Sequence, residues 1–101
     1  MAADRGWLEV PAFQMALTLV EFGRQLQPVL AGWHVESFAD SWHLQRGGRQ
    51  IRIICQPLGS ARLGALELPR LDVMLFFSGC DTAEEASFLD LFWRYFRRGG
   101  G

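Results

Sequence analysis

The 101-residue sequence predicts an α+β fold, namely a two-layer sandwich in which an antiparallel sheet of three to five strands carries two helices on one face. Three observations favour this class. A helical pattern lies near the N-terminus, a second lies at the C-terminal end, and the region between them alternates apolar with polar residues. We therefore expect the order β-α-β-β-β-β-α or close to it. Residues 1–98 form one domain in this prediction, and residues 99–101 form a flexible glycine tail.

The first helix is predicted to follow a short strand over residues 6–10. Pro11 has the fixed φ that suits a first helical position, and Pro28 marks the end of the helix near Gln27. A single polar stripe recurs at spacings of four, three and four residues, formed by Gln14, Thr18, Glu21 and Gln25. Apolar side chains fill most of the remaining surface, so this helix is more apolar than one packing face requires.

The central strands are predicted from a hairpin turn at residues 46–49, where two glycines can adopt the positive φ values that tight turns need. This turn would place Leu44 opposite Ile51, Trp42 opposite Ile53, and His43 opposite Arg52. Upstream, residues 33–38 read as extended and are expected to continue into residues 42–45 through a bend. Downstream, residues 56–64 are expected to form a loop, and residues 65–68 and 71–77 to form strands on either side of Pro69.

The last helix is predicted from Ala83 to about Arg98. Thr82 and Glu85 have the spacing of a capping box, and arginines gather at the opposite end, where the helix dipole favours positive charge. Apolar residues again cover more than one face of this helix: Phe88, Leu89, Leu91, Phe92, Trp93, Tyr95 and Phe96.

The surplus apolar surface of the two helices predicts association, because monomers seldom expose large apolar patches. We expect a homodimer or another protein partner, contacted by Trp93, Tyr95, Leu91, Met15, Leu19 and Phe22. In the alternative interpretation, the two helices lie side by side over the sheet and hide each other's flanks. The sequence alone leaves both interpretations open.

Composition excludes several functions. The formal net charge of −1 does not favour nucleic acid or an acidic membrane surface, and no apolar run is long enough to span a bilayer. Because the first residues do not resemble a leader peptide, we expect a cytoplasmic protein. The sequence lacks Lys and Asn and is rich in Arg, Gly, Ala and Leu, a bias that indicates a GC-rich bacterial source.

No motif identifies a catalytic site, a cofactor, a metal or a small-molecule ligand, so we expect a binding or accessory protein without catalysis of its own. Two alternatives remain. Arg46, Arg49 and Arg52 could form a basic edge for RNA. A small enzyme could instead use a pocket near Cys80 and His34, although Cys55 and Cys80 lack the spacing of a metal or redox pair and are expected to be free thiols.

Overall fold

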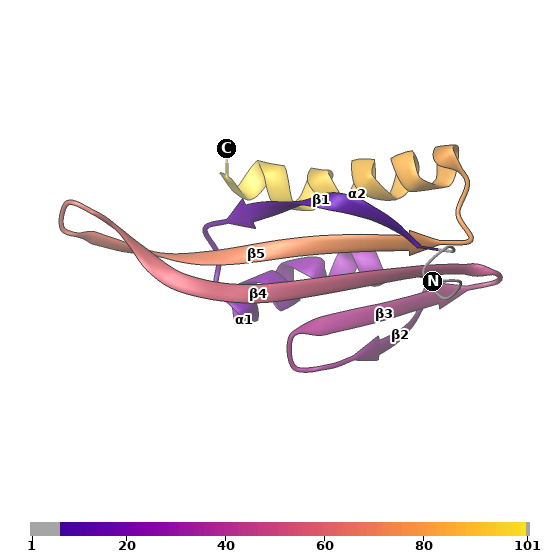
Figure 1. Ribbon diagram of the computed structural model, residues 1–101, viewed down its shortest axis with the longest axis horizontal. Helices are drawn as coiled ribbons and strands as arrows, with labels where there is room; N and C mark the ends of the chain where they lie inside the picture. The colour runs from indigo at the N-terminus through magenta and orange to yellow at the C-terminus, as the bar shows by residue number, and fades with distance from the viewer. Residues whose placement is uncertain (1–6, 101) are drawn as a thin grey trace.

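The computed structural model describes residues 7–100, and its elements follow the predicted order (Figure 1). They are β1 (Leu8–Met15), α1 (Leu19–Leu26), the short 3-10 helix η2 (Gln27–Leu30), β2 (His34–Ser37), β3 (Ser41–Arg46), β4 (Arg49–Leu63), β5 (Leu66–Ser78) and α2 (Thr82–Gly100).

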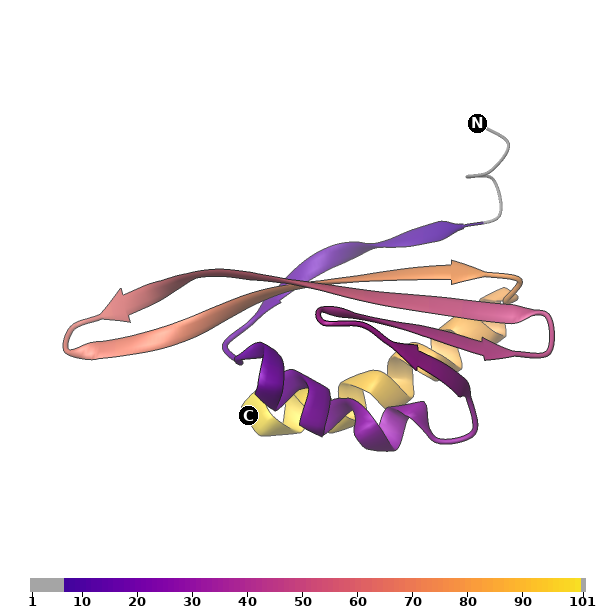
Figure 2. The same cartoon turned by 90° about the horizontal axis from the view of Figure 1, so that it is seen from below.

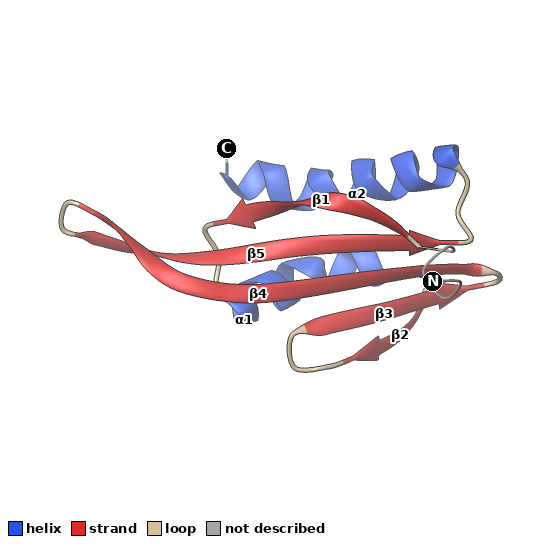
Figure 3. Ribbon diagram, viewed as in Figure 1, coloured by secondary structure: helices blue, strands red, loops and turns tan. Residues whose placement is uncertain are grey.

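The fold is the predicted α+β sandwich. The strands form one antiparallel five-stranded sheet in the order β1-β5-β4-β3-β2. Both helices lie on the same face of this sheet, and within residues 7–100 the opposite face carries no helix (Figure 2; the helices and strands are distinguished by colour in Figure 3). One layer of helices is therefore enough to build the core. The other face, called the uncovered face below, carries no helix or strand of the described part of the chain.

The prediction of a first helix from Pro11 to Gln27 is wrong at its N-terminal end. Strand β1 continues to Met15, with a register shift between Val10 and Phe13 in its pairing with β5. Proline has no N–H for the sheet, so an irregularity is expected at Pro11. Helix α1 begins only after Thr18, whose side chain accepts from the Glu21 N–H at 3.1 Å while the Glu21 carboxylate accepts from the Thr18 N–H at 2.9 Å. Two of the orphan donors at the start of the helix are satisfied in this way.

The predicted hairpin between β3 and β4 is confirmed in its register. Leu44 pairs with Ile51, Trp42 with Ile53 and His43 with Arg52. The segment before it differs from the prediction, because β2 and β3 are separate antiparallel strands joined by a turn, with Phe38 N–H donating to Ser41 O at 2.8 Å.

The predicted loop over residues 56–64 is wrong, because β4 runs through it to Leu63. Residues 65–68 and 71–77 belong to one strand, β5, rather than to two. The two strands stay paired from Gln50 opposite Ser78 to Leu63 opposite Leu66, with one register shift between Leu58 and Ala61. The far end of this hairpin extends well beyond the helices and its strands twist around each other (Figures 1 and 2).

Helix α2 begins at Thr82, but Asp81 and not Thr82 is the capping residue. The Asp81 Oδ1 accepts from the Glu84 N–H at 2.8 Å, and the Glu84 carboxylate accepts from the Asp81 N–H at 2.8 Å. The capping box is therefore shifted by one residue from the predicted pair of Thr82 and Glu85. The helix reaches Gly100, so Gly99 and Gly100 of the predicted tail continue it, and Gly101 lies outside the described residues.

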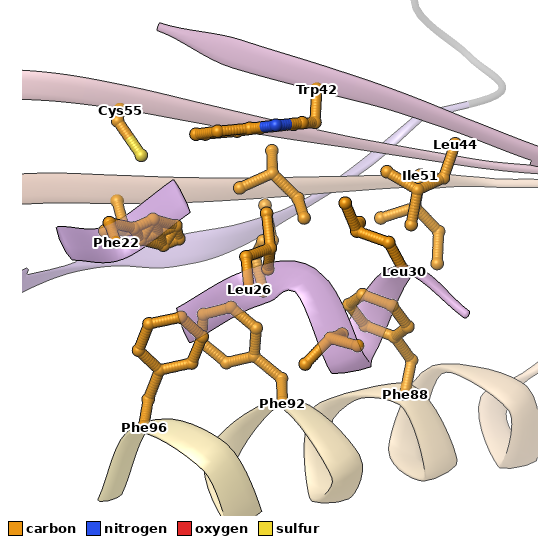
Figure 4. Close-up of a cluster of buried hydrophobic side chains, with 14 of the residues drawn as sticks. Phe22, Leu26, Leu30, Trp42, Leu44, Ile51, Cys55, Phe88, Phe92 and Phe96 are labelled. Atoms are coloured by element: carbon orange, nitrogen blue, oxygen red, sulfur yellow. The ribbon is translucent and has the colours of Figure 1, made fainter. Parts of the chain in front are cut away.

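The core lies between the helices and the covered face of the sheet, and aromatic rings dominate its helical side (Figure 4). Phe92 is fully buried, with its ring centroid 4.6 Å from that of Phe96 and 6.2 Å from that of Phe22. Alternate residues of the two long strands complete the core from the sheet: Ile51, Ile53, Cys55, Leu71, Val73, Leu75 and Phe77. Period-two alternation thus directs one apolar row inward. The expectation from the sequence that residues 71–77 are buried on both faces is wrong, because Asp72, Met74 and Phe76 stay partly exposed on the face that no helix covers within residues 7–100.

Candidate binding sites

The six residues predicted for an interface do not form one exposed patch. Phe22 is fully buried, and its ring lies 4.7 Å from that of Phe96. Met15 lies on β1 and not on a helix. The other four residues, Leu19, Leu91, Trp93 and Tyr95, are partly buried against the core, as is Met15. Self-association stays a prediction, but these side chains offer it little exposed apolar surface.

Contacts between α2, α1 and β1 account for much of that burial. The Trp93 ring lies 4.7 Å from the ring of Phe13 on β1. The backbone carbonyl of Tyr95 accepts from the side-chain amide of Gln25 on α1 at 2.9 Å. The helices therefore hide part of each other's flanks, and β1 covers a further part.

The large apolar side chains that are exposed in the described structure lie mostly on the sheet and on its extended hairpin. Leu63 and Leu66, at the far end of the β4–β5 hairpin, are 61 % and 63 % exposed. Phe38, in the turn between β2 and β3, is 58 % exposed, and the others are Leu8 on β1 and Val20 on α1. Apolar surface is thus available, but away from most of the residues that the sequence indicated.

The hairpin beyond the helices, residues 58–68, is called the arm below. Across its register shift, Leu58 pairs with Arg70, whereas Ala61 pairs with Leu68 and Leu63 with Leu66. Directly paired residues in an antiparallel sheet share a face, and successive residues alternate between faces. One side of the arm is therefore lined by Leu58, Ala61, Leu63, Leu66 and Leu68, and the other side carries the pair of Arg62 and Glu67.

The apolar side of the arm continues the uncovered face of the sheet. Counting by twos along β5 from Leu66 and Leu68 passes the charged residues Arg70 and Asp72 and then reaches Met74 and Phe76. The buried residues of that strand are instead Leu71, Val73, Leu75 and Phe77. The register shift at Gly59 and Ser60 preserves this arrangement, because the extra residue in β4 brings Ala61 and Leu63 onto the same side as their partners.

Two hollows lie on the uncovered face. One, of about 320 Å³, is lined by Trp7, Glu9, Arg52, Ile54 and Phe76. The other, of about 340 Å³, shares Arg52 and Ile54 with the first and is also lined by Phe38 and His43. The Arg52 guanidinium lies 5.0 Å from the Trp7 ring centroid, a cation–π contact that covers part of the sheet.

A third cavity, of about 430 Å³, lies on the helical side of the sheet, where the first turns of α2 face the β3–β4 turn. Trp33, Ile51, Phe88 and Leu91 supply apolar walls, and the polar lining includes Arg46, Arg49, Cys80, Asp81, Glu84 and Ser87. The sequence suggested a pocket near Cys80 but not the rest of its lining, because the walls come from three separate segments.

The three arginines of the predicted RNA-binding edge are placed apart by their contacts. Arg46 lies over the Trp33 ring at 4.3 Å, and Arg49 forms an ion pair with Glu84. Arg52 points to the uncovered face, over Trp7. The hydrogen bond from the Asp81 backbone N–H is the largest cause that lowers the pKa of the Glu84 carboxyl, and the ion pair with Arg49 lowers it further. The same ion pair raises the pKa of Arg49.

Cys80 lines the 430 Å³ cavity, whereas His34 does not. Burial raises the pKa of the Cys80 thiol, and the nearby carboxylates of Glu84 and Glu85 raise it further, so the neutral thiol is favoured. Cys55 is buried in β4 and is likewise a free thiol. Among residues 7–100, no group of three or more His, Cys, Asp or Glu side chains is placed to hold a metal ion.

Comparison of the chain with protein-family models, with curated proteins and with solved structures finds no match. No helix within the described part of the chain has the length and apolar character needed to cross a membrane. The function therefore has to be inferred from the surfaces of the chain itself.

Proposed function

We propose that this chain is a non-catalytic binding module that forms a homodimer through the apolar side of its arm and the uncovered face of its sheet. The observation that carries the proposal is the arm itself, a two-stranded ribbon with five apolar residues on one side. An isolated ribbon of two strands is at best marginally stable in water. A partner that covers the leucines would stabilise it.

A second copy of the chain is the occupant that the surface favours. A twofold symmetric interface uses the same patch on both subunits, so the patch must contain both the projecting and the receiving feature. Here the arm projects, and the hollows beside Phe76 and Phe38 lie on the face that the apolar side of the arm continues. Each arm could thus rest on the sheet of the other copy.

The charges of this face are compatible with self-contact. Next to the arm, this face carries one base and one acid of β5, Arg70 and Asp72, on the same side as Leu66 and Leu68. The 320 Å³ hollow likewise contains one acid and one base, Glu9 and Arg52. Two copies would therefore meet without an excess of like charge, which otherwise opposes association.

We further propose that the module works in the bacterial cytoplasm. Its two cysteines are free thiols, which is the usual state of cysteine in a reducing compartment. The sequence bias toward Arg in place of Lys supports a GC-rich bacterial source.

Solution mass over a concentration series, measured by light scattering, tests the homodimer. The wild-type chain should give the dimer mass, and the double variant Leu63→Asp, Leu66→Asp should give the monomer mass with an unchanged far-UV circular dichroism spectrum. The matched control is Arg62→Ser, Glu67→Ser, which changes the polar side of the arm at the neighbouring cross-strand pair and should leave the dimer intact.

A second control, Val20→Asp, places a new acid at an exposed apolar position of α1 and should also leave the dimer mass unchanged. A wild-type mass equal to one chain throughout the series would contradict the proposal. If the double leucine variant still forms the dimer, the arm is not the interface. An interface at the helical residues Leu91, Trp93 and Tyr95 would then be favoured instead.

A further inference from the structure

The 430 Å³ cavity beside the start of α2 is distinct from the dimer surface proposed above. Its walls come from the segment between η2 and β2, from both ends of the β3–β4 turn, and from the first turns of α2. Ile51 and Phe88, two of its apolar lining residues, belong to the core on the helical side of the sheet. A volume of this size falls in the range of small-molecule sites.

The acidic groups of the cavity already have partners. Glu84 accepts from the Asp81 N–H and forms the ion pair with Arg49, while Asp81 accepts from the Glu84 N–H. These contacts fix the helix cap against the β3–β4 turn. They also leave Arg49 neutralised, so this residue does not present a free positive charge to the cavity.

Arg46 differs from Arg49. Its guanidinium lies over the Trp33 ring, 4.3 Å from the centroid, and no carboxylate within the described residues lies within 4.0 Å of it. Stacking on an aromatic ring holds the planar group in place and leaves its N–H donors free at the edge. Such a donor edge matches the two oxygens of a carboxylate.

We propose that this cavity binds a small molecule that joins an apolar body to a single carboxylate. Arg46 would bind the carboxylate, and Trp33, Phe88 and Leu91 would contact the apolar body. The Ser87 hydroxyl can donate a further hydrogen bond from the wall, whereas the Cys80 thiol already donates to the Ser78 carbonyl at 3.9 Å. A dianion such as a phosphate monoester is less suitable, because the Asp81 and Glu84 carboxylates line the same cavity and would repel the second charge.

The test uses 3-phenylpropanoate as the probe and its uncharged amide as the comparison, both titrated into the full-length protein and followed by NMR. The carboxylate should shift the indole signal of Trp33 and the amides of Cys80 and Ser87, and should bind about ten-fold more tightly than the amide, as expected for one charge-assisted hydrogen-bonded pair. In Arg46→Gln, the two compounds should bind with equal affinity.

Two further variants distinguish a loss of binding at the cavity from a general loss of folding. Arg94→Gln removes an exposed arginine of α2 that lies outside the cavity, and it should leave the affinities for both compounds unchanged. Ser87→Leu fills the cavity from an exposed helical position and should weaken both compounds together. Equal affinity of the wild-type protein for the acid and the amide would overturn the proposal, as would shifts confined to residues outside the cavity or no binding at the solubility limit of the probe.

Discussion

The connection between β5 and α2 depends on Gly79, and replacing this glycine by alanine tests how closely α2 is held to the β3–β4 turn. Gly79 has a φ of +75°, a value that residues with a side chain rarely adopt. A Cβ atom at this position would also overlap the backbone carbonyl oxygen of Gly48 and lie 3.5 Å from the Arg49 Cα. Because these are backbone atoms, they cannot move aside as a flexible side chain could.

Gly47 provides the matched control. It has a φ of +60°, but a Cβ built on it meets no atom within 4 Å. Gly47→Ala should therefore cost only the strain of the left-handed conformation, about 1–2 kcal/mol. Gly79→Ala should add the cost of forcing extra volume into a closed contact, about 1–3 kcal/mol. The total of about 2–5 kcal/mol is a large part of the stability of a small domain.

Urea unfolding at one fixed protein concentration measures both variants, since the stability of a dimer depends on concentration. We expect unchanged denaturant slopes and a clearly lower midpoint for Gly79→Ala than for Gly47→Ala. If the losses of unfolding free energy of the two variants agree within about 0.5 kcal/mol, the close approach of the two backbone segments is not a feature of the folded protein. The placement of α2 beside the β3–β4 turn, on which the cavity depends, would then be contradicted.

Three other predictions follow from the described contacts. Phe92→Ala should lower the free energy of unfolding by about 3–5 kcal/mol, whereas Val20→Ala, at an exposed position of α1 outside the proposed dimer surface, should change the free energy little; chemical denaturation compares them. Asp81→Ala should lower the free energy of unfolding by about 0.5–2 kcal/mol in the same assay, and Thr82→Ala should lower it much less. A larger loss for Thr82→Ala would instead favour the capping box of Thr82 and Glu85 that the sequence predicts. Burial, with a smaller contribution from Asp40, raises the pKa of the Cys55 thiol from 9.0 to about 12, so the folded state keeps its proton longer than the unfolded state. The free energy of unfolding should therefore fall as the pH rises from 9 toward 12, and Cys55→Ala should show a smaller fall.

The sequence predicted the elements whose signals are local. The β3–β4 hairpin has a glycine turn and a consistent alternation of apolar residues, so its register could be worked out. Helix α2 has acids at its start and a long apolar pattern, although the cap lies one residue earlier than expected. The element order and the placement of both helices on one face also followed from these patterns.

Strand β1 shows why the first helix was misplaced. Phe13, Met15 and Leu17 satisfy a period of two as well as the broad apolar surface of a helix, so the local pattern is ambiguous. Pairing with β5 decides in favour of the strand, and this pairing joins residues far apart in the sequence. The Thr18 and Glu21 capping box was a signal for the true start of α1, and it could have corrected the boundary.

The arm could not be predicted for a similar reason. Pro57, Gly59 and Gly64 are typical of loops, but all three belong to this hairpin. Pro57 pairs with Leu71, and Gly59 lies in the register shift that absorbs one extra residue. Gly64 forms the turn of the hairpin with a φ of +60°. Only the register between the two strands shows that the leucines gather on one side. Local composition therefore indicated a loop where cross-strand pairing produces an amphipathic ribbon.

The surplus of apolar residues on the helices also has a structural explanation, because β1 runs close enough for Phe13 to contact both Phe92 and Trp93. Apart from Val20 on α1, the large apolar side chains that remain exposed lie on the sheet, its turns and the arm, while the cavity near Arg46 lies on the helical side. The two proposals therefore concern separate surfaces, and sites without shared contacts should behave additively. The double leucine variant should bind 3-phenylpropanoate with wild-type affinity, and Arg46→Gln should keep the wild-type mass in solution. A loss of carboxylate binding in the leucine variant would show that the cavity is complete only in the dimer.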